Sequence, residues 1–173
     1  LSMVPAVFVG VFFESEIESL FNGNLTIVGV MLIFTGALLF LADKAKPSEK
    51  KISFSSSLLV GIAQAIAIIP GISRSGATIS TAVILGIDKE NAAKFSFLMV
   101  VPLIIGKVIK DITSAETIVN NESVFPLIIG FVFAFITGMI ACKWMIKLVK
   151  NSKLKYFSIY CFLIGIFSII SAI

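Results

Sequence analysis

The chain has 173 residues, of which 58% are hydrophobic and 14% are charged, with a formal net charge of +4. Soluble domains average about 25% charged residues, so this composition excludes an ordinary soluble domain. It favours a single transmembrane domain spanning residues 1–173, because each crossing takes about 20 apolar residues. The lysines cluster between apolar runs, as in the cytoplasmic loops of membrane proteins. The positive charge therefore indicates membrane topology and not nucleic-acid binding.

Charge-free runs define the expected elements, because an unpaired charge at the centre of a bilayer costs about 2.5 to 3.5 kcal/mol. The run 1–13 is followed by three glutamates, and four later apolar segments are expected to be crossing helices. These segments are 19–42, 95–106, 123–142 and 156–173, with Asp88 as the cap of the helix that contains the second. In the third, Gly130, Ala134, Gly138 and Cys142 fall four apart, so one face of this helix is small enough for close contact with another helix. Chance spacing in a helix rich in small residues explains this pattern equally well.

The uncharged run 52–73 does not read as one helix, because Pro70 and Gly71 interrupt it. It divides into half-helices over 56–69 and 75–87, which are too short to span a bilayer. A re-entrant hairpin here leaves two crossings between the lysine-rich loops 44–51 and 143–155, so both loops lie on one side. A broken spanning helix would translocate one of them, against the positive-inside tendency. We therefore favour the hairpin, with the C-terminus outside.

Arg74 is the only arginine of the chain, with 22 uncharged residues before it and 13 after it. A charge inside the membrane layer is a functional hypothesis by default, although an arginine can also snorkel to the headgroups or pair with a carboxylate. Its neighbours favour function, because the second half-helix begins at this turn and helix N-termini bind anions. The planar guanidinium group of arginine can also form two parallel hydrogen bonds with a phosphate group. The predicted phosphate-binding residues are Gly71, Ser73, Arg74, Ser75, Gly76 and Thr78, with Arg74 and Ser73 as the catalytic candidates.

Other candidates carry less information. Gln64 could point into the same cavity or serve in packing. Glu14 and Glu18 are four apart and could bind a metal ion from one helix face, but such charges are more often simply solvated. The chain has no histidine, which is the commonest general acid or base.

Three segments together resemble a known family. They are 4–14 (VPAVFVGVFFE), 61–78 (GIAQAIAIIPGISRSGAT) and 93–102 (AKFSFLMVVP). They resemble the middle region and second signature of the bacterial undecaprenyl-diphosphate phosphatases of the bacitracin-resistance type. The resemblance implies an all-α polytopic membrane protein, a helical bundle with re-entrant hairpins in an inverted-repeat fold. It also implies removal of the terminal phosphate from the C55 carrier lipid diphosphate, for peptidoglycan synthesis at the bacterial inner (plasma) membrane.

The family's first signature, a glutamate-rich helix followed by a Pro-Ile-Ser-Ser-Thr-Gly-His type turn, does not occur in this sequence. The resemblance therefore implies an N-terminally truncated member that is inactive alone. It also implies a divalent cation, Mg or Ca, for which this chain offers no evident ligands. The implied partners are the membrane and a polyprenyl diphosphate lipid, without nucleic acid, and a homo-oligomer is allowed. The rival hypothesis is an anion or lipid-phosphate transporter, since half-helix N-termini also bind substrates in carriers.

Overall fold

The computed structural model describes residues 2–13, 25–46, 50–113, 124–151 and 154–172. Within these ranges the chain forms helices and no strands. The helices are α1 (Val4–Phe12), α3 (Leu25–Lys44), α4 (Phe54–Ile66), α5 (Arg74–Ile84), α6 (Lys89–Thr113), α7 (Val124–Lys150) and α8 (Leu154–Ile170). The all-α architecture predicted from the sequence is confirmed.

Three described helices are long and apolar enough to cross a membrane, namely those over Leu25–Lys44, Lys89–Lys110 and Phe125–Lys150. The apolar helix α8 has 17 residues, at the lower limit of a spanning length. Many large apolar side chains on these helices are exposed, for example Phe131 at 72% and Phe167 at 67%. Such surfaces are suited to lipid and not to water, so the chain is a helical membrane protein.

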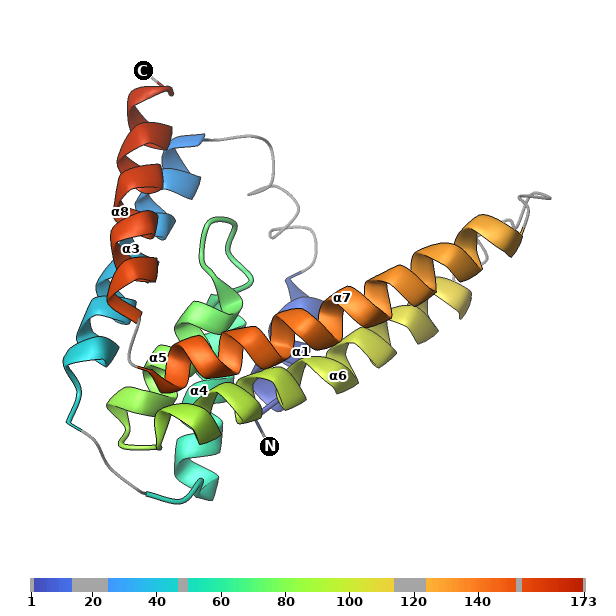
Figure 1. Ribbon diagram of the computed structural model, residues 1–173, viewed down its shortest axis with the longest axis horizontal. Coiled ribbons are helices and arrows are strands. Elements are labelled where there is room, and N and C mark those ends of the chain that lie inside the picture. The colour runs from blue at the N-terminus through green and yellow to red at the C-terminus, as the bar shows by residue number, and fades with distance from the viewer. Residues whose placement is uncertain (1, 14–24, 47–49, 114–123, 152–153, 173) are drawn as a thin grey trace.

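Helices α3 and α8 form the closest pair, and they stand side by side in Figure 1. Their backbones approach so closely that a Cβ atom on Gly29 would lie 2.7 Å from the Gly165 carbonyl oxygen. The Ser158 hydroxyl donates a hydrogen bond of 2.7 Å to the Gly36 carbonyl, and the Ser168 hydroxyl donates one of 3.0 Å to the Leu25 carbonyl. Small residues and hydroxyl groups thus hold this pair together, as is common between membrane helices.

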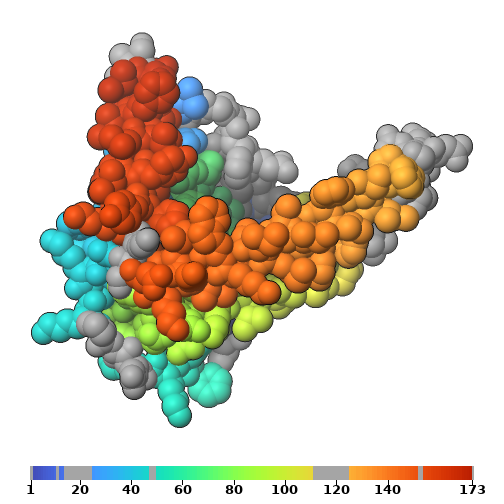
Figure 2. Space-filling view, in the orientation of Figure 1, coloured from blue at the N-terminus to red at the C-terminus, as the bar shows by residue number. Residues whose placement is uncertain are grey.

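Helices α6 and α7 form a second pair that extends away from the other helices as an arm (Figure 1 and Figure 2). Asp88 caps α6 as predicted, because its carboxylate accepts hydrogen bonds from the backbone N–H groups of Glu90 and Asn91. The small-residue face of α7 is exposed, and a Cβ atom on Gly130 or Gly138 would meet no other atom within 4 Å. The contact that this face would allow is therefore not formed within the described part of the chain, and chance spacing explains the pattern there.

Helices α4 and α5 form the predicted helix–turn–helix unit at the centre of the bundle. Ser53 and Ser56 form a capping box at the start of α4, which fixes where that helix begins. Helix α5 packs against α3, α4 and α6, and seven of its 11 residues are buried. The core cluster around it includes Val60 of α4 and Ile79 of α5. That this hairpin re-enters the membrane from one side stays a prediction.

Candidate functional site

The site is built on the N-terminus of α5. Ser73 is the N-cap residue, and its hydroxyl oxygen accepts a hydrogen bond of 3.1 Å from the Gly76 N–H. The Ser73 carbonyl accepts the first helical bond, of 2.8 Å, from the Ala77 N–H. Among the described residues, nothing accepts a hydrogen bond from the backbone N–H groups of Arg74 and Ser75. Two donors at the positive end of the helix dipole therefore stay available for an anion.

Arg74 is the first residue of α5, and its side chain is exposed although most of the helix is buried. No carboxylate in the described part of the chain forms an ion pair with its guanidinium group. The structural alternative of a buried Arg–carboxylate pair thus has no support within those ranges. A guanidinium group can bind phosphate bidentately, and Arg74 also carries one of the two free N–H groups.

Thr78 lies one turn further along and is buried, with 1% of its surface exposed. Its hydroxyl donates to the Arg74 carbonyl at 2.9 Å, and it lies 2.6 Å from the Ser96 hydroxyl of α6. The structure thus gives this hydroxyl partners in the contact between α5 and α6. A direct contact between Thr78 and phosphate stays a prediction.

Helix α3 packs against the turn between α4 and α5, a contact that the sequence did not indicate. Gly71 has a φ of +94°, and a Cβ atom there would lie 2.5 Å from the Val28 carbonyl oxygen. The Ser73 N–H donates a hydrogen bond of 3.2 Å to the Thr35 hydroxyl oxygen. Only glycine combines this backbone conformation with so close an approach. The turn is therefore seated on one face of α3.

Gln64 of α4 is buried, with 1% of its surface exposed. Neither its amide nitrogen nor its amide oxygen has a hydrogen-bond partner among the described residues, and the same holds for the Ser80 hydroxyl. Burying an unpaired polar group costs about 1 to 3 kcal/mol. Such groups usually mark a place where water, an ion or a further polar group completes the structure. The burial of Gln64 allows both a packing role and a position beside a cavity, so both predictions stay open.

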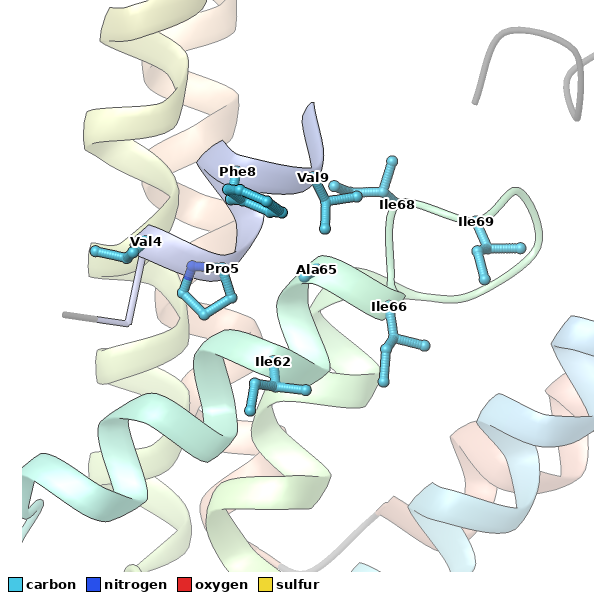
Figure 3. Close-up of a pocket in the computed structure, with 9 residues that line it drawn as sticks. All are labelled: Val4, Pro5, Phe8, Val9, Ile62, Ala65, Ile66, Ile68 and Ile69. Carbon is cyan, nitrogen blue, oxygen red and sulfur yellow. The ribbon is translucent and has the colours of Figure 1, made fainter. Parts of the chain in front are cut away.

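An apolar groove of about 540 Å³ lies between α1, the end of α4 and the turn that follows it (Figure 3). Its lining is entirely apolar and consists of Val4, Pro5, Phe8, Val9, Ile62, Ala65, Ile66, Ile68 and Ile69. Ile68 and Ile69 immediately precede Pro70 and Gly71 of the turn. The groove therefore begins on the same connection that carries the α5 N-terminus.

The described residues show no cluster of the acidic, histidine or cysteine side chains that commonly bind metal ions. No group of three or more His, Cys, Asp or Glu side chains gathers within those ranges. Glu14 and Glu18, the candidate metal-binding pair, lie outside the described residues. The divalent cation that the resemblance implies stays a prediction.

The fold and the site define a helical membrane protein with a central helix hairpin and an arginine at the start of its second helix. A model of the family described as "Bacitracin resistance protein BacA" matches residues 1–167. The chain belongs to this family, which confirms the resemblance stated from the sequence.

Curated relatives extend this finding. The undecaprenyl-diphosphatase of Christiangramia forsetii is 56% identical over 99% of this chain. That of Bacteroides fragilis is 47% identical over 98% of the chain, and that of Methanobrevibacter smithii is 38% identical over 96%. The matches cover 65%, 65% and 61% of these relatives. The chain thus spans a little under two thirds of the length of the relatives that it matches.

Proposed function

We propose that this chain is the diphosphate-binding part of an undecaprenyl-diphosphatase. The observation that carries the proposal is the N-terminus of α5, where Arg74 is exposed and the N–H groups of Arg74 and Ser75 have no acceptor among the described residues. One relative that carries this enzyme name is 56% identical to the chain over 99% of its length. The substrate would be a polyprenyl diphosphate lipid, hydrolysed by water to the lipid monophosphate and inorganic phosphate.

The residues of the site would act mainly by electrostatic stabilisation. During phosphoryl transfer, negative charge is spread over the oxygens of the transferring group, and fixed donors stabilise it. The Arg74 guanidinium group and the two free N–H groups would supply such donors. No residue of the described site is an evident general base. We therefore expect residues 1–173 alone to bind the substrate without turning it over.

The apolar groove supports a lipid substrate. Its 540 Å³ volume falls in the range of ligand sites, and its aliphatic lining suits isoprenoid units. A chain lying in the groove would reach the turn at Ile68 and Ile69, directly before the residues that would hold its diphosphate. The head and the tail of one molecule can therefore be bound by adjacent parts of the same hairpin.

The cellular setting follows from the same proposal. An enzyme of this kind would act in the bacterial plasma membrane, recycle the carrier lipid for peptidoglycan synthesis and contribute to bacitracin resistance. A divalent cation stays a prediction from the resemblance, and its ligands would lie outside the described residues. A homo-oligomer also stays a prediction.

The test is phosphate release from undecaprenyl diphosphate by the complete gene product in detergent. Removing one fixed donor to a transferring oxygen costs about 100- to 1000-fold in kcat, so Arg74→Ala should lower the rate by about that factor. Arg74→Lys keeps the charge but loses the planar guanidinium group, and an intermediate rate is expected. Lys46→Ala, at an exposed lysine away from the turn, is the control and should not change the rate.

Two results would contradict the proposal. Full hydrolysis by the Arg74→Ala variant would remove Arg74 from the site. Absence of phosphate release by the wild type, together with movement of lipid phosphate or anions across proteoliposome membranes, would favour a transporter, since half-helix N-termini bind anions in such proteins as well.

A further inference from the structure

Thr35 of α3 connects this helix to the anion-binding end of α5 across 38 residues of sequence. Its side chain has no exposed surface. Its hydroxyl oxygen accepts a hydrogen bond of 3.2 Å from the Ser73 N–H and donates one of 3.0 Å to the Met31 carbonyl. We propose that Thr35 is a positioning residue for the diphosphate site, a role that rests on the proposed function.

The direction of the two hydrogen bonds is the first step of the argument. Because the hydroxyl proton is directed at the Met31 carbonyl within α3, the oxygen lone pairs are free to accept from Ser73. The orientation of the acceptor is thus set by the helix and not by the turn. The backbone N–H of Ser73, the N-cap residue of α5, is thereby hydrogen-bonded to α3.

The second step concerns the neighbouring donors. The peptide groups of Arg74 and Ser75 follow Ser73 directly, so the Ser73 conformation determines where their free N–H groups point. The chain before Ser73 contains Gly71 at a φ of +94°, and a glycine restricts the backbone little. The hydrogen bond from the Ser73 N–H to Thr35 therefore joins this end of α5 to α3 and restrains the direction of the two donors relative to that helix.

The methyl group of Thr35 has a separate role. Its Cγ2 atom lies 3.1 Å from the position that a Cβ atom on Gly76 would occupy. The methyl group packs against the first turn of α5, while the hydroxyl holds the N-cap. Valine keeps the shape of threonine and loses the acceptor, whereas serine keeps the acceptor and loses the methyl group. The two substitutions thus separate packing from positioning.

The experiment measures kcat and KM for undecaprenyl diphosphate with the complete gene product. Thr35→Val leaves the partly buried Ser73 N–H without its acceptor, and a lost hydrogen bond corresponds to about a tenfold change in an equilibrium or rate constant. We expect kcat/KM to fall about 5- to 20-fold, with kcat lowered and KM raised, because the two N–H groups would bind the diphosphate in the ground state and more tightly in the transition state. Thr35→Ser should retain kcat/KM within about twofold.

Ser158→Ala is the matched control. It removes a buried hydroxyl that donates to the Gly36 carbonyl, so it also takes one hydrogen bond from α3. A merely structural role of Thr35 would lower the stability of Thr35→Val and Ser158→Ala alike, with kcat unchanged in both. That result, or a loss of kcat in Thr35→Ser as large as in Thr35→Val, would overturn the inference.

A second measurement separates this inference from the proposed function. If the wild type releases no phosphate, the proposed function fails, and the same variants are compared for the Kd of farnesyl diphosphate in detergent. A higher Kd in Thr35→Val, with an unchanged Kd in Thr35→Ser, would still support the positioning role. Equal Kd values for all variants would overturn it.

Discussion

Gly71→Ala tests whether the stability of the protein depends on the close contact between the α4–α5 turn and α3. The substitution meets two penalties in the structure. A residue with a Cβ atom at a φ of +94° is strained by about 1 to 2 kcal/mol. The new atom would also lie 2.5 Å from the Val28 carbonyl oxygen and 2.8 Å from the Val28 Cα atom, and overpacking costs about 1 to 3 kcal/mol. We expect a loss of about 2 to 5 kcal/mol in the free energy of unfolding.

The loss can be measured by unfolding the purified protein in mixed detergent micelles. Gly130→Ala on α7 is the matched control, because a Cβ atom there would meet no other atom within 4 Å. It should be neutral or stabilise by about 0.5 to 1 kcal/mol, as alanine does in a helix. If Gly71→Ala and Gly130→Ala unfold at the same denaturant concentration, the close contact between the turn and α3 does not exist in the protein.

Two further substitutions test the packing and the buried polar groups. Gly165→Ala should lower the free energy of unfolding by about 1 to 3 kcal/mol, because its Cβ atom would lie 2.8 Å from the Gly29 carbonyl oxygen of α3. Gly138→Ala is the control in the same unfolding assay. Equal stability of the two variants would contradict the observed pairing of α3 with α8. Gln64→Met removes an amide without partners among the described residues, so in the same unfolding assay it should stabilise the protein by about 1 to 3 kcal/mol. A destabilised Gln64→Met would mean that the amide has a partner in the folded protein.

The sequence predicted the helices well because the membrane imposes a simple rule on charge. Charged residues bound nearly every apolar run, so the predicted segment 95–106 falls within α6 and 123–142 within α7, apart from residue 123, which lies outside the described residues. Pro70 and Gly71 correctly placed the break between α4 and α5. Local chemistry was sufficient in these cases, since helix ends depend on neighbouring residues.

Helix pairing was harder to predict because it depends on which faces meet. The sequence drew attention to the even spacing of small residues on α7, yet that face is exposed. The close contact lies instead between Gly29 of α3 and Gly165 of α8, which are isolated glycines far apart in the chain. A small residue permits close approach but does not identify its partner. The spacing of small residues alone therefore could not decide between a helix–helix contact and a chance pattern.

The same limit explains which part of the site the sequence revealed. Arg74 and its neighbours are adjacent in the chain, so one turn brings their donors together without help from the rest of the fold. Thr35 and Val28 had no distinguishing feature in an uncharged helix, and they enter the site only because α3 packs behind the turn. The donors are thus encoded locally, whereas their orientation depends on a distant helix. It follows that substitutions on the turn-facing side of α3 should alter the binding of the diphosphate although none of them would touch it.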